Sequence, residues 1–352
     1  MVKRGLAVCL LFCLALAGCA TAGGGASIAN HPTSPSPTCA ASVCGATTGA
    51  TNVQVFVEPA AGEAPVVHAI QGAQRSVWVE VYLLTDHTVI YALEDAAQRG
   101  VDVRVLLELN PYGSGTTSPT QTLQELQTAG VKAEGADSAY HYTHEKAMII
   151  DGATLFIMTA NLTKSGLGGS SYAENREYGV IDTAAADVGE ATSIFQADWQ
   201  RTTPTLSAPN LVVSPVNARA RLLAFINNAH STLLVEDEEM YDAQSEDALI
   251  AAARRGVTVD VVLPQPSGSS PGADADVARL MQGGVQVRYI SVVYMHAKML
   301  LADGKLAFVG SENFSANSLD DNRELGIVIA DTQAITTLGQ TFQRDWTSAQ
   351  AA

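Results

Sequence analysis

Two copies of one short pattern of histidine, lysine and acidic side chains lie 152 residues apart in this chain. The first copy has His144, Lys146, Asp151, Asn161 and Glu177, and the second has His296, Lys298, Asp303, Asn313 and Glu324. In both copies the lysine and the asparagine are 15 residues apart, and the glutamate ends an Asn-Arg-Glu tripeptide (175–177 and 322–324). Chance explains one such pattern in a long chain but not two with matched spacing. We therefore infer two structural halves that share one site, with two histidines and two lysines suited to handling phosphate.

A pair of histidines can cleave a phosphodiester without a metal ion. One neutral imidazole attacks phosphorus and becomes a phosphohistidine, while the other protonates the departing oxygen and then activates the acceptor. Each ring needs a carboxylate on its far nitrogen to fix its tautomer, and Glu177 and Glu324 are the candidates. The two lysines and the two asparagines of the pattern would bind the nonbridging oxygens and stabilise the charge of the transition state.

Some of these residues also have ordinary structural explanations. Asp-Gly follows the lysine in both copies (151–152 and 303–304) and is a strong tight-turn dipeptide, so each motif is predicted to be a hairpin whose first strand displays histidine and lysine. The two aspartates then either shape these turns or belong to the site. Each asparagine either caps a helix or faces the site, and each glutamate either ends a strand in solvent or reaches the site. Repetition at matched places favours the site for the asparagines and the glutamates.

The elements that must position these residues repeat as well. Hydrophobic periodicity predicts strands over 77–84 and 101–107 with a helix over 88–98 between them. The second half repeats this order with strands over 232–235 and 257–263 and a helix over 247–255. AAQRGVDVRVLL (96–107) aligns with AARRGVTVDVVL (252–263), and the pattern breaks at a proline-rich stretch around 202–215. The prediction is an α/β fold in which helices cover a sheet in each half.

These motifs resemble those of the two-motif phospholipase D superfamily over roughly residues 53–350. The first copy departs from the family pattern, because Met158-Thr159 takes the place of the usual Gly-Ser, although Thr159 keeps a hydroxyl. The second copy fits the extended motif in full, with His296, Lys298, Asp303, Gly310, Ser311 and Asn313.

The resemblance implies two similar α/β/α domains, 52–205 and 206–352, related by a pseudo-twofold axis with the active site at their interface. It also implies that His144 is the nucleophile and His296 the acid, and that no cofactor or metal takes part. The activity that we expect is a phospholipase D-type hydrolysis of glycerophospholipids to phosphatidic acid. The alternatives are a phosphatidyltransferase similar to cardiolipin synthases, a secreted phosphodiester nuclease, and an envelope lipoprotein that only binds.

The net charge and the N-terminal residues indicate which partners and which location to expect for the protein. The formal net charge is −16, which opposes nucleic-acid binding at long range and speaks against the nuclease. Residues 1–18 resemble a signal peptide, and Leu16-Ala17-Gly18-Cys19 resembles a lipobox that would lipidate Cys19. A plain signal peptide cut after Ala20 or Ala22 is the alternative. With a flexible tether over 19–51, these features predict an exported lipoprotein anchored to the bacterial envelope membrane, with no obligate protein partner. Cys39 and Cys44 could form a disulfide in that tether.

Other residues carry less weight in the sequence. His141 is predicted to lie on the strand face opposite His144, as a loop or packing residue. Tyr142 and Tyr294 each precede a motif histidine by two residues and either line the cleft or pack in a strand. The acidic run 236–239 (Glu-Asp-Glu-Glu) lacks partner ligands at metal-site spacing and is interpreted as solvated loop charge.

Overall fold

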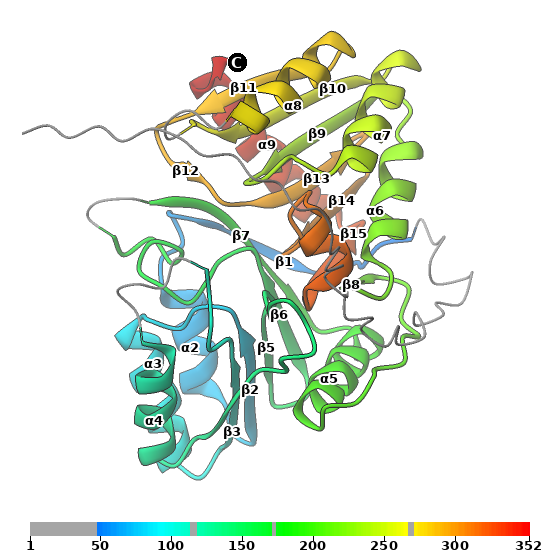
Figure 1. The fold of residues 1–352 in the computed structure, drawn as a ribbon. Coiled ribbons are helices and arrows are strands. Elements are labelled where there is room, and N and C mark those ends of the chain that lie inside the picture. The colour runs from blue at the N-terminus through cyan, green and yellow to red at the C-terminus, as the bar shows by residue number, and fades with distance from the viewer. Residues whose placement is uncertain (1–47, 113–117, 171–173, 267–270) are drawn as a thin grey trace, which may run out of the picture. The chain divides into compact units, whose positions relative to one another are not determined.

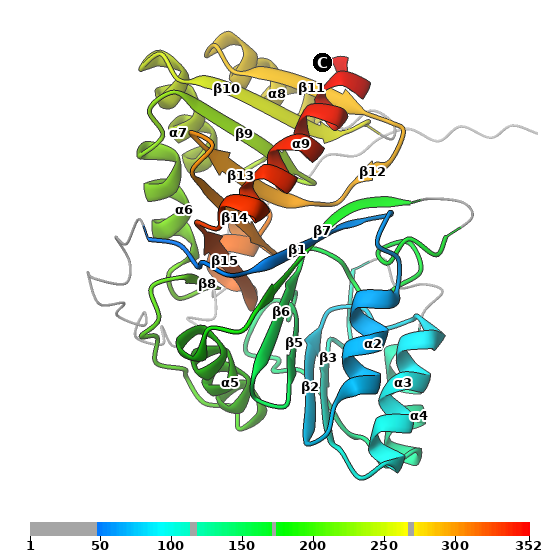
Figure 2. The same cartoon turned by 180° about the vertical axis from the view of Figure 1, so that it is seen from behind.

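The structure, a computed structural model, describes residues 48–112, 118–170, 174–266 and 271–352. Two mixed β-sheets with their helices follow one another along this part of the chain (Figures 1 and 2). The first sheet has the order β1 (Gln54–Glu58), β7 (Asn175–Asp182), β6 (Thr154–Met158), β5 (Lys146–Ile150), β2 (Ser76–Val81), β3 (Asp102–Leu107) and β4 (Lys132–Gly135). The second has the order β16 (Gln350–Ala351), β11 (Gln286–Ile290), β10 (Thr258–Pro264), β9 (Thr232–Asp237), β13 (Lys298–Ala302), β14 (Leu306–Gly310), β15 (Glu324–Ile329) and β8 (Leu211–Ser214).

The helices complete the two halves. In the described residues they are α2 (Ala64–Gly72), α3 (His87–Gln98), α4 (Pro119–Thr128), α5 (Ala185–Trp199), α6 (Ala218–Asn227), α7 (Ala243–Arg254), α8 (Pro271–Gln282) and α9 (Thr332–Ser348), with the π-helical turn η1 (Asn317–Asp321). A further short strand, β12 (Tyr294–Met295), belongs to the second half in sequence but pairs with β7 of the first sheet.

The two sheets repeat one topology. β2, β3 and β4 are parallel, as are β9, β10 and β11. On the other side of β2 and of β9 the strands become antiparallel, through β5, β6 and β7 in the first half and β13, β14 and β15 in the second. The predicted α/β fold with two similar halves is therefore confirmed.

Three apolar cores hold these layers together. One core packs α2 and α3 on the outer face of the first sheet, and a second packs α6 and α7 on the outer face of the second sheet. The third core joins residues of both sheets with α5 and α9 (Figure 2). In β13, Met299 and Leu301 enter the shared core while Leu300 enters the outer core. A strand buried on both faces needs apolar residues throughout, which is why the motif lysines precede unbroken hydrophobic runs.

The helices α3 and α7, which hold matching places in the two halves, begin and end in the same way. Asp86 caps α3 by accepting from the backbone N–H of Thr88 at 2.8 Å, and Asp242 caps α7 by accepting from Ser245 at 2.9 Å. Gly100 and Gly256 follow these helices with φ of 89° and 92°, a left-handed conformation that favours glycine. The helix predicted over 247–255 thus begins earlier than expected, because the cap lies at residue 242.

The Asp-Gly hairpins form as predicted, and the aspartates tie them to neighbouring strands. Asp151 and Asp303 have φ of 55° and 54° and turn the chain between the hairpin strands. The Asp151 carboxylate accepts from the backbone N–H groups of residues 74–76, and the Asp303 carboxylate from those of residues 230–232. Each aspartate therefore anchors the start of the adjacent strand at the end of the hairpin opposite its histidine.

Several expectations concern the first residues and the division of the chain. The signal peptide, Cys19 and the Cys39–Cys44 pair lie outside the described residues, so the lipid anchor, the tether and the disulfide stay predictions. The boundary at 205/206 falls between α5 and β8 and also stays a prediction. Among the described helices, none is both long and apolar enough to cross a bilayer.

Candidate active site

Each motif histidine binds a glutamate of the other half. Nδ1 of His144 lies 2.9 Å from Oε2 of Glu324, and Nδ1 of His296 lies 2.7 Å from Oε1 of Glu177. A carboxylate on Nδ1 fixes the proton there and leaves Nε2 free for chemistry. The two glutamates thus take the orienting position that the sequence suggested, but each acts across the two halves.

Backbone pairing between the halves brings these groups together. The N–H of His144 donates to the carbonyl of Arg323 at 2.9 Å, and that of His296 donates to the carbonyl of Arg176 at 3.3 Å. β12 extends this contact by pairing Tyr294 with Asn175 of β7. Each histidine segment therefore runs beside the Asn-Arg-Glu tripeptide of the opposite half.

Every side chain of the first tripeptide has a partner. Asn175 Nδ2 donates to Glu177 Oε1 at 2.9 Å and helps to hold the carboxylate that binds His296. Arg176 donates to Asp345 on α9 of the second half, at 2.5 and 2.9 Å.

The second tripeptide repeats these contacts. Asn322 Nδ2 donates to Glu324 Oε1 at 3.0 Å, and Arg323 donates to Asp198 on α5 of the first half at 2.9 Å. Sequence reasoning noted the tripeptide but missed the roles of its Asn and Arg, although their repetition was visible.

The two orienting carboxylates are fully buried and kept ionised. Burial alone would raise the pKa of Glu177 and of Glu324, but their histidine partners outweigh it, and the pKa of each is lowered. Thr159 Oγ1 donates to Glu177 Oε2 at 2.6 Å, so the hydroxyl retained in the first motif is used. Ser311 takes the corresponding position and helps to lower the pKa of Glu324.

The two lysines are buried beside their histidines but differ in charge environment. Nζ of Lys146 donates to the carbonyl of His144, and Nζ of Lys298 donates to that of His296 at 2.6 Å. Burial lowers the pKa of Lys146 to about 7. Burial also opposes the charge of Lys298, but Glu238 outweighs it and raises the pKa of that lysine. Burial also lowers the pKa of His144, to about 4, and thereby keeps its ring neutral.

Both histidines line one cavity of about 540 Å³. Asn161 and Asn313 line it too, and among the described residues neither side-chain oxygen has a hydrogen-bond partner. The asparagines therefore face the site. The cavity holds two imidazoles, each bound to a carboxylate through Nδ1, and two amides, which is a composition suited to in-line displacement at phosphorus.

Comparison with known proteins agrees with this geometry. Residues 66–199 and 222–346, more than half of the chain, match the family described as "Cardiolipin synthase, PLD-like domain". The chain belongs to this family. It is thus an enzyme of the phospholipase D superfamily.

Individual relatives are distant in sequence. A cardiolipin synthase of Halalkalibacterium halodurans is 24% identical over 84% of this chain and 66% of its own length, and a minor cardiolipin synthase of Bacillus subtilis is 24% identical over 80% and 77%. The chain therefore spans slightly less than two thirds of the first of these relatives. The crystal structure of a phosphatidylserine synthase from Haemophilus influenzae has a TM-score of 0.65 at 11% identity and covers 85% of this chain and 87% of its own, which shows a shared fold.

These comparisons correct the expected activity. The relatives are named cardiolipin synthases, which transfer a phosphatidyl group, so the expected hydrolysis to phosphatidic acid is wrong as the main function. The motifs alone could not separate these outcomes, because hydrolysis and transfer use the same phosphohistidine and differ only in the acceptor.

The interpretation of the acidic run 236–239 is also wrong. β9 continues to Asp237, so Glu236 and Asp237 are buried in the sheet, at 0% and 1% exposure. Glu238 and Glu239 line the cavity with the two histidines. Charged residues at the end of a strand can enter a site, and the run offered no spacing by which to recognise this.

The structure also places the smaller expectations. His141 lies in a loop, which was one of its two expected explanations, but it is not on a strand face and lines the cavity together with Tyr142. Tyr294 binds Glu238 at 3.0 Å. Asp151 and Asp303 are not among the residues that line the cavity, and their turn-shaping explanation agrees with their contacts.

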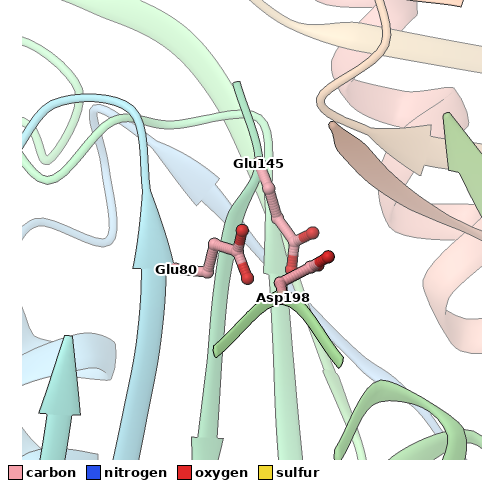
Figure 3. A group of neighbouring side chains, drawn as sticks. All are labelled: Glu80, Glu145 and Asp198. Atoms are coloured by element: carbon pink, nitrogen blue, oxygen red, sulfur yellow. The ribbon is translucent and has the colours of Figure 1, made fainter. Parts of the chain in front are cut away.

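Behind the first histidine lies a cluster of buried carboxyl groups. Oxygens of Glu80, Glu145 and Asp198 lie within 4.8 Å of one another (Figure 3). Burial raises the pKa of Glu145 to about 8 and that of Glu80 well above its usual range. Protons on these groups and the ion pair of Asp198 with Arg323 balance the charge, so the cluster supports the interface between the halves.

Proposed function

We propose that this protein is a phosphatidyltransferase similar to cardiolipin synthases. It would cleave the headgroup phosphodiester of one phospholipid and pass the phosphatidyl group to a hydroxyl of a second. The observation that carries the proposal is the pair of histidines in one cavity, each with Nδ1 bound to a carboxylate, so that Nε2 is the nitrogen that would react. The names of the relatives support transfer over hydrolysis.

In the first step Nε2 of His144 attacks phosphorus while the bond from phosphorus to the headgroup oxygen breaks. Nε2–H of His296 protonates that oxygen, and the headgroup alcohol leaves. The new phosphohistidine carries its remaining proton on Nδ1, where Glu324 accepts it in a hydrogen bond and stabilises the positive ring.

In the second step His296 acts as a base. Its neutral Nε2 takes the proton of the acceptor hydroxyl as the acceptor oxygen attacks phosphorus and the P–N bond breaks. His144 regains its neutral ring, so both histidines return to their starting states. Lys146 and Lys298 stabilise the charge on the nonbridging oxygens, and such a donor lowers the barrier by about 3 kcal/mol. No cofactor is required.

The test is a lipid assay with labelled phosphatidylglycerol vesicles and a metal chelator. We expect conversion to diphosphatidylglycerol with release of glycerol, and loss of conversion in His144→Ala. His87→Ala, which changes an exposed histidine on α3, is the matched control and should remain active. Phosphatidic acid as the only product, or activity that depends on a metal, would contradict the proposal.

A further inference from the structure

The cavity is lined differently beside its two histidines. The residue of β2 that pairs with Lys146 is Val81, and the residue of β9 that pairs with Lys298 is Asp237. The next residue therefore holds the same place in each half, and it is Tyr82 in the first half. The Tyr82 ring centroid lies 4.6 Å from that of His144 and 5.4 Å from Nζ of Lys146, so this side of the cavity is neutral and aromatic.

In the second half the same place holds Glu238, a carboxylate. Its Oε2 lies 2.9 Å from Nζ of Lys298 and 3.4 Å from Nε2 of His296. Its Oε1 accepts from the hydroxyl of Tyr294 at 3.0 Å, which fixes the direction of the carboxylate. The side chain is 19% exposed, and the residue lines the cavity with both histidines.

Through these contacts a negatively charged carboxylate lies against the two groups that would contact the phosphate in the proposed reaction. In that reaction Lys298 binds a nonbridging oxygen of the phosphate, and Nε2 of His296 protonates the headgroup oxygen. A carboxylate that binds both atoms occupies the place of a phosphate oxygen, because each is an anionic acceptor of similar reach. Burial alone would raise the pKa of Glu238, but His296 and Lys298 outweigh it and lower the pKa, so the group stays ionised.

We propose that Glu238 is a specificity residue, which holds the phosphate position in the resting enzyme and disfavours doubly charged phosphomonoesters relative to singly charged phosphodiesters. This inference rests on the proposed function, because it takes the cavity as a phosphodiester site. A ligand must displace the carboxylate from Lys298 and then bind near its charge. Coulomb repulsion grows with the charge of the ligand, so a phosphate dianion is penalised about twice as much as a diester monoanion.

The consequence is a pocket matched to one negative charge. A phosphodiester lipid would bind once Glu238 has turned away, whereas inorganic phosphate and phosphomonoester lipids would compete poorly. The neutral Tyr82 cannot perform this function on the other side, so the discrimination depends on a single position.

The experiment measures binding of inorganic phosphate and of diethyl phosphate to the whole protein by titration calorimetry. At about pH 7.5 the dianion is the predominant form of inorganic phosphate, while diethyl phosphate, which has a single acidic group, stays a monoanion. We expect Glu238→Gln to tighten phosphate binding by about tenfold and diethyl phosphate binding by about threefold, as expected for removal of one nearby charge.

Glu125→Gln is the control, because it removes the same charge from an exposed position on α4 that does not line the cavity. We expect it to change the binding of either ligand by less than about twofold. Glu238→Tyr, which copies the residue of the other half, is a second variant in case the first folds poorly, and it should also tighten phosphate binding.

Three results would overturn the inference. These are unchanged phosphate binding in both Glu238 variants, equal tightening of both ligands, and an equal effect of Glu125→Gln. The lipid assay is run in parallel. Tighter phosphate binding without lipid transfer would refute the proposed function and keep this inference, and normal transfer without tighter phosphate binding would do the reverse.

Discussion

Glu324 binds Nδ1 of His144 across 180 residues of sequence, at 2.9 and 3.0 Å. The same contact recurs between Glu177 and His296 with the halves exchanged. Neither half therefore contains a complete catalytic unit, because each histidine obtains its tautomer from the other half. This exchange explains why two copies of the pattern are needed in one chain.

Removing the charge of Glu324 should impair catalysis more than stability. In Glu324→Gln the amide no longer favours the Nδ1–H tautomer and cannot stabilise the positive ring, so we expect kcat to fall by about 10³-fold. Glu125→Gln, on the exposed side of α4, is the control and should leave kcat unchanged. The comparison uses initial rates of lipid transfer, with circular dichroism to verify folding. A loss of less than about tenfold would contradict the orienting role.

The pH dependence of kcat/KM should report the pKa values of the groups that the free enzyme uses in the reaction. Burial lowers the pKa of His144 to about 4, so the ring is neutral above that pH and kcat/KM should rise through about pH 4 instead of near 6.5. Burial lowers the pKa of Lys146 to about 7, so this lysine loses its charge above that pH and kcat/KM should fall. A profile with its acid limb near pH 6.5 would contradict a buried neutral nucleophile.

The basic limb has its own control. Lys146→Arg keeps a positive charge to about pH 12 or above, since guanidinium does not titrate in the working range. This variant should lose the decline near pH 7 even if its maximal rate is lower. A decline that persists unchanged would assign the basic limb to another group.

The cross-half ion pairs should contribute strongly to stability. Arg323 and Asp198 are 0% and 2% exposed, so Arg323→Met leaves a buried carboxylate without its partner and should lower the free energy of unfolding by about 3–5 kcal/mol. Asp95→Asn breaks the exposed Arg99–Asp95 pair of α3 and should cost about 0–1 kcal/mol. Urea unfolding measures both values. Equal losses would mean that Arg323 does not join the halves.

The parts of the fold and of the site that could be predicted from the sequence are mainly those that occur twice in it. Asp151-Gly152 and Asp303-Gly304 predicted both hairpins, because the turn chemistry is local. The matched Glu177 and Glu324 predicted the orienting carboxylates. The exchange of partners could not be predicted, since it depends on strand pairing between halves that no local pattern encodes.

Glu238 shows the opposite limit of prediction. Its counterpart is Tyr82, so no repetition marked it, and the neighbouring Glu236, Asp237 and Glu239 made it resemble ordinary surface charge. β9 ends at Asp237, so Glu236 and Asp237 lie in the sheet while Glu238, the next residue, reaches the cavity. This end point could not be identified from the sequence.

The motif aspartates should matter for folding and not for chemistry. Asp303 accepts hydrogen bonds from the backbone of residues 230–232, and Asp303→Ala leaves those N–H groups without an acceptor. Charged hydrogen bonds of this kind contribute about 1.5–3 kcal/mol, so the free energy of unfolding should fall by that order. The kcat of the folded fraction should stay within about twofold of the parent enzyme, because the residue does not line the cavity. A large fall in kcat at full folding would return Asp303 to the site.

The carboxyl cluster behind His144 predicts how stability changes with pH. Burial raises the pKa of Glu145 in the folded protein to about 8, from an ordinary value of 4.5. Between these pH values the folded state holds a proton that the unfolded state has lost, so each rise in pH within this window lowers stability.

The second half has Ala297 at the matching position before its lysine, and so lacks this third carboxyl group. Glu145→Gln keeps the shape and removes the titration, so its free energy of unfolding should decline less than that of the parent between about pH 5 and pH 8. Urea unfolding across this range provides the test, with Glu125→Gln as the exposed control; parallel curves for parent and Glu145→Gln would show that Glu145 is already ionised in the folded protein.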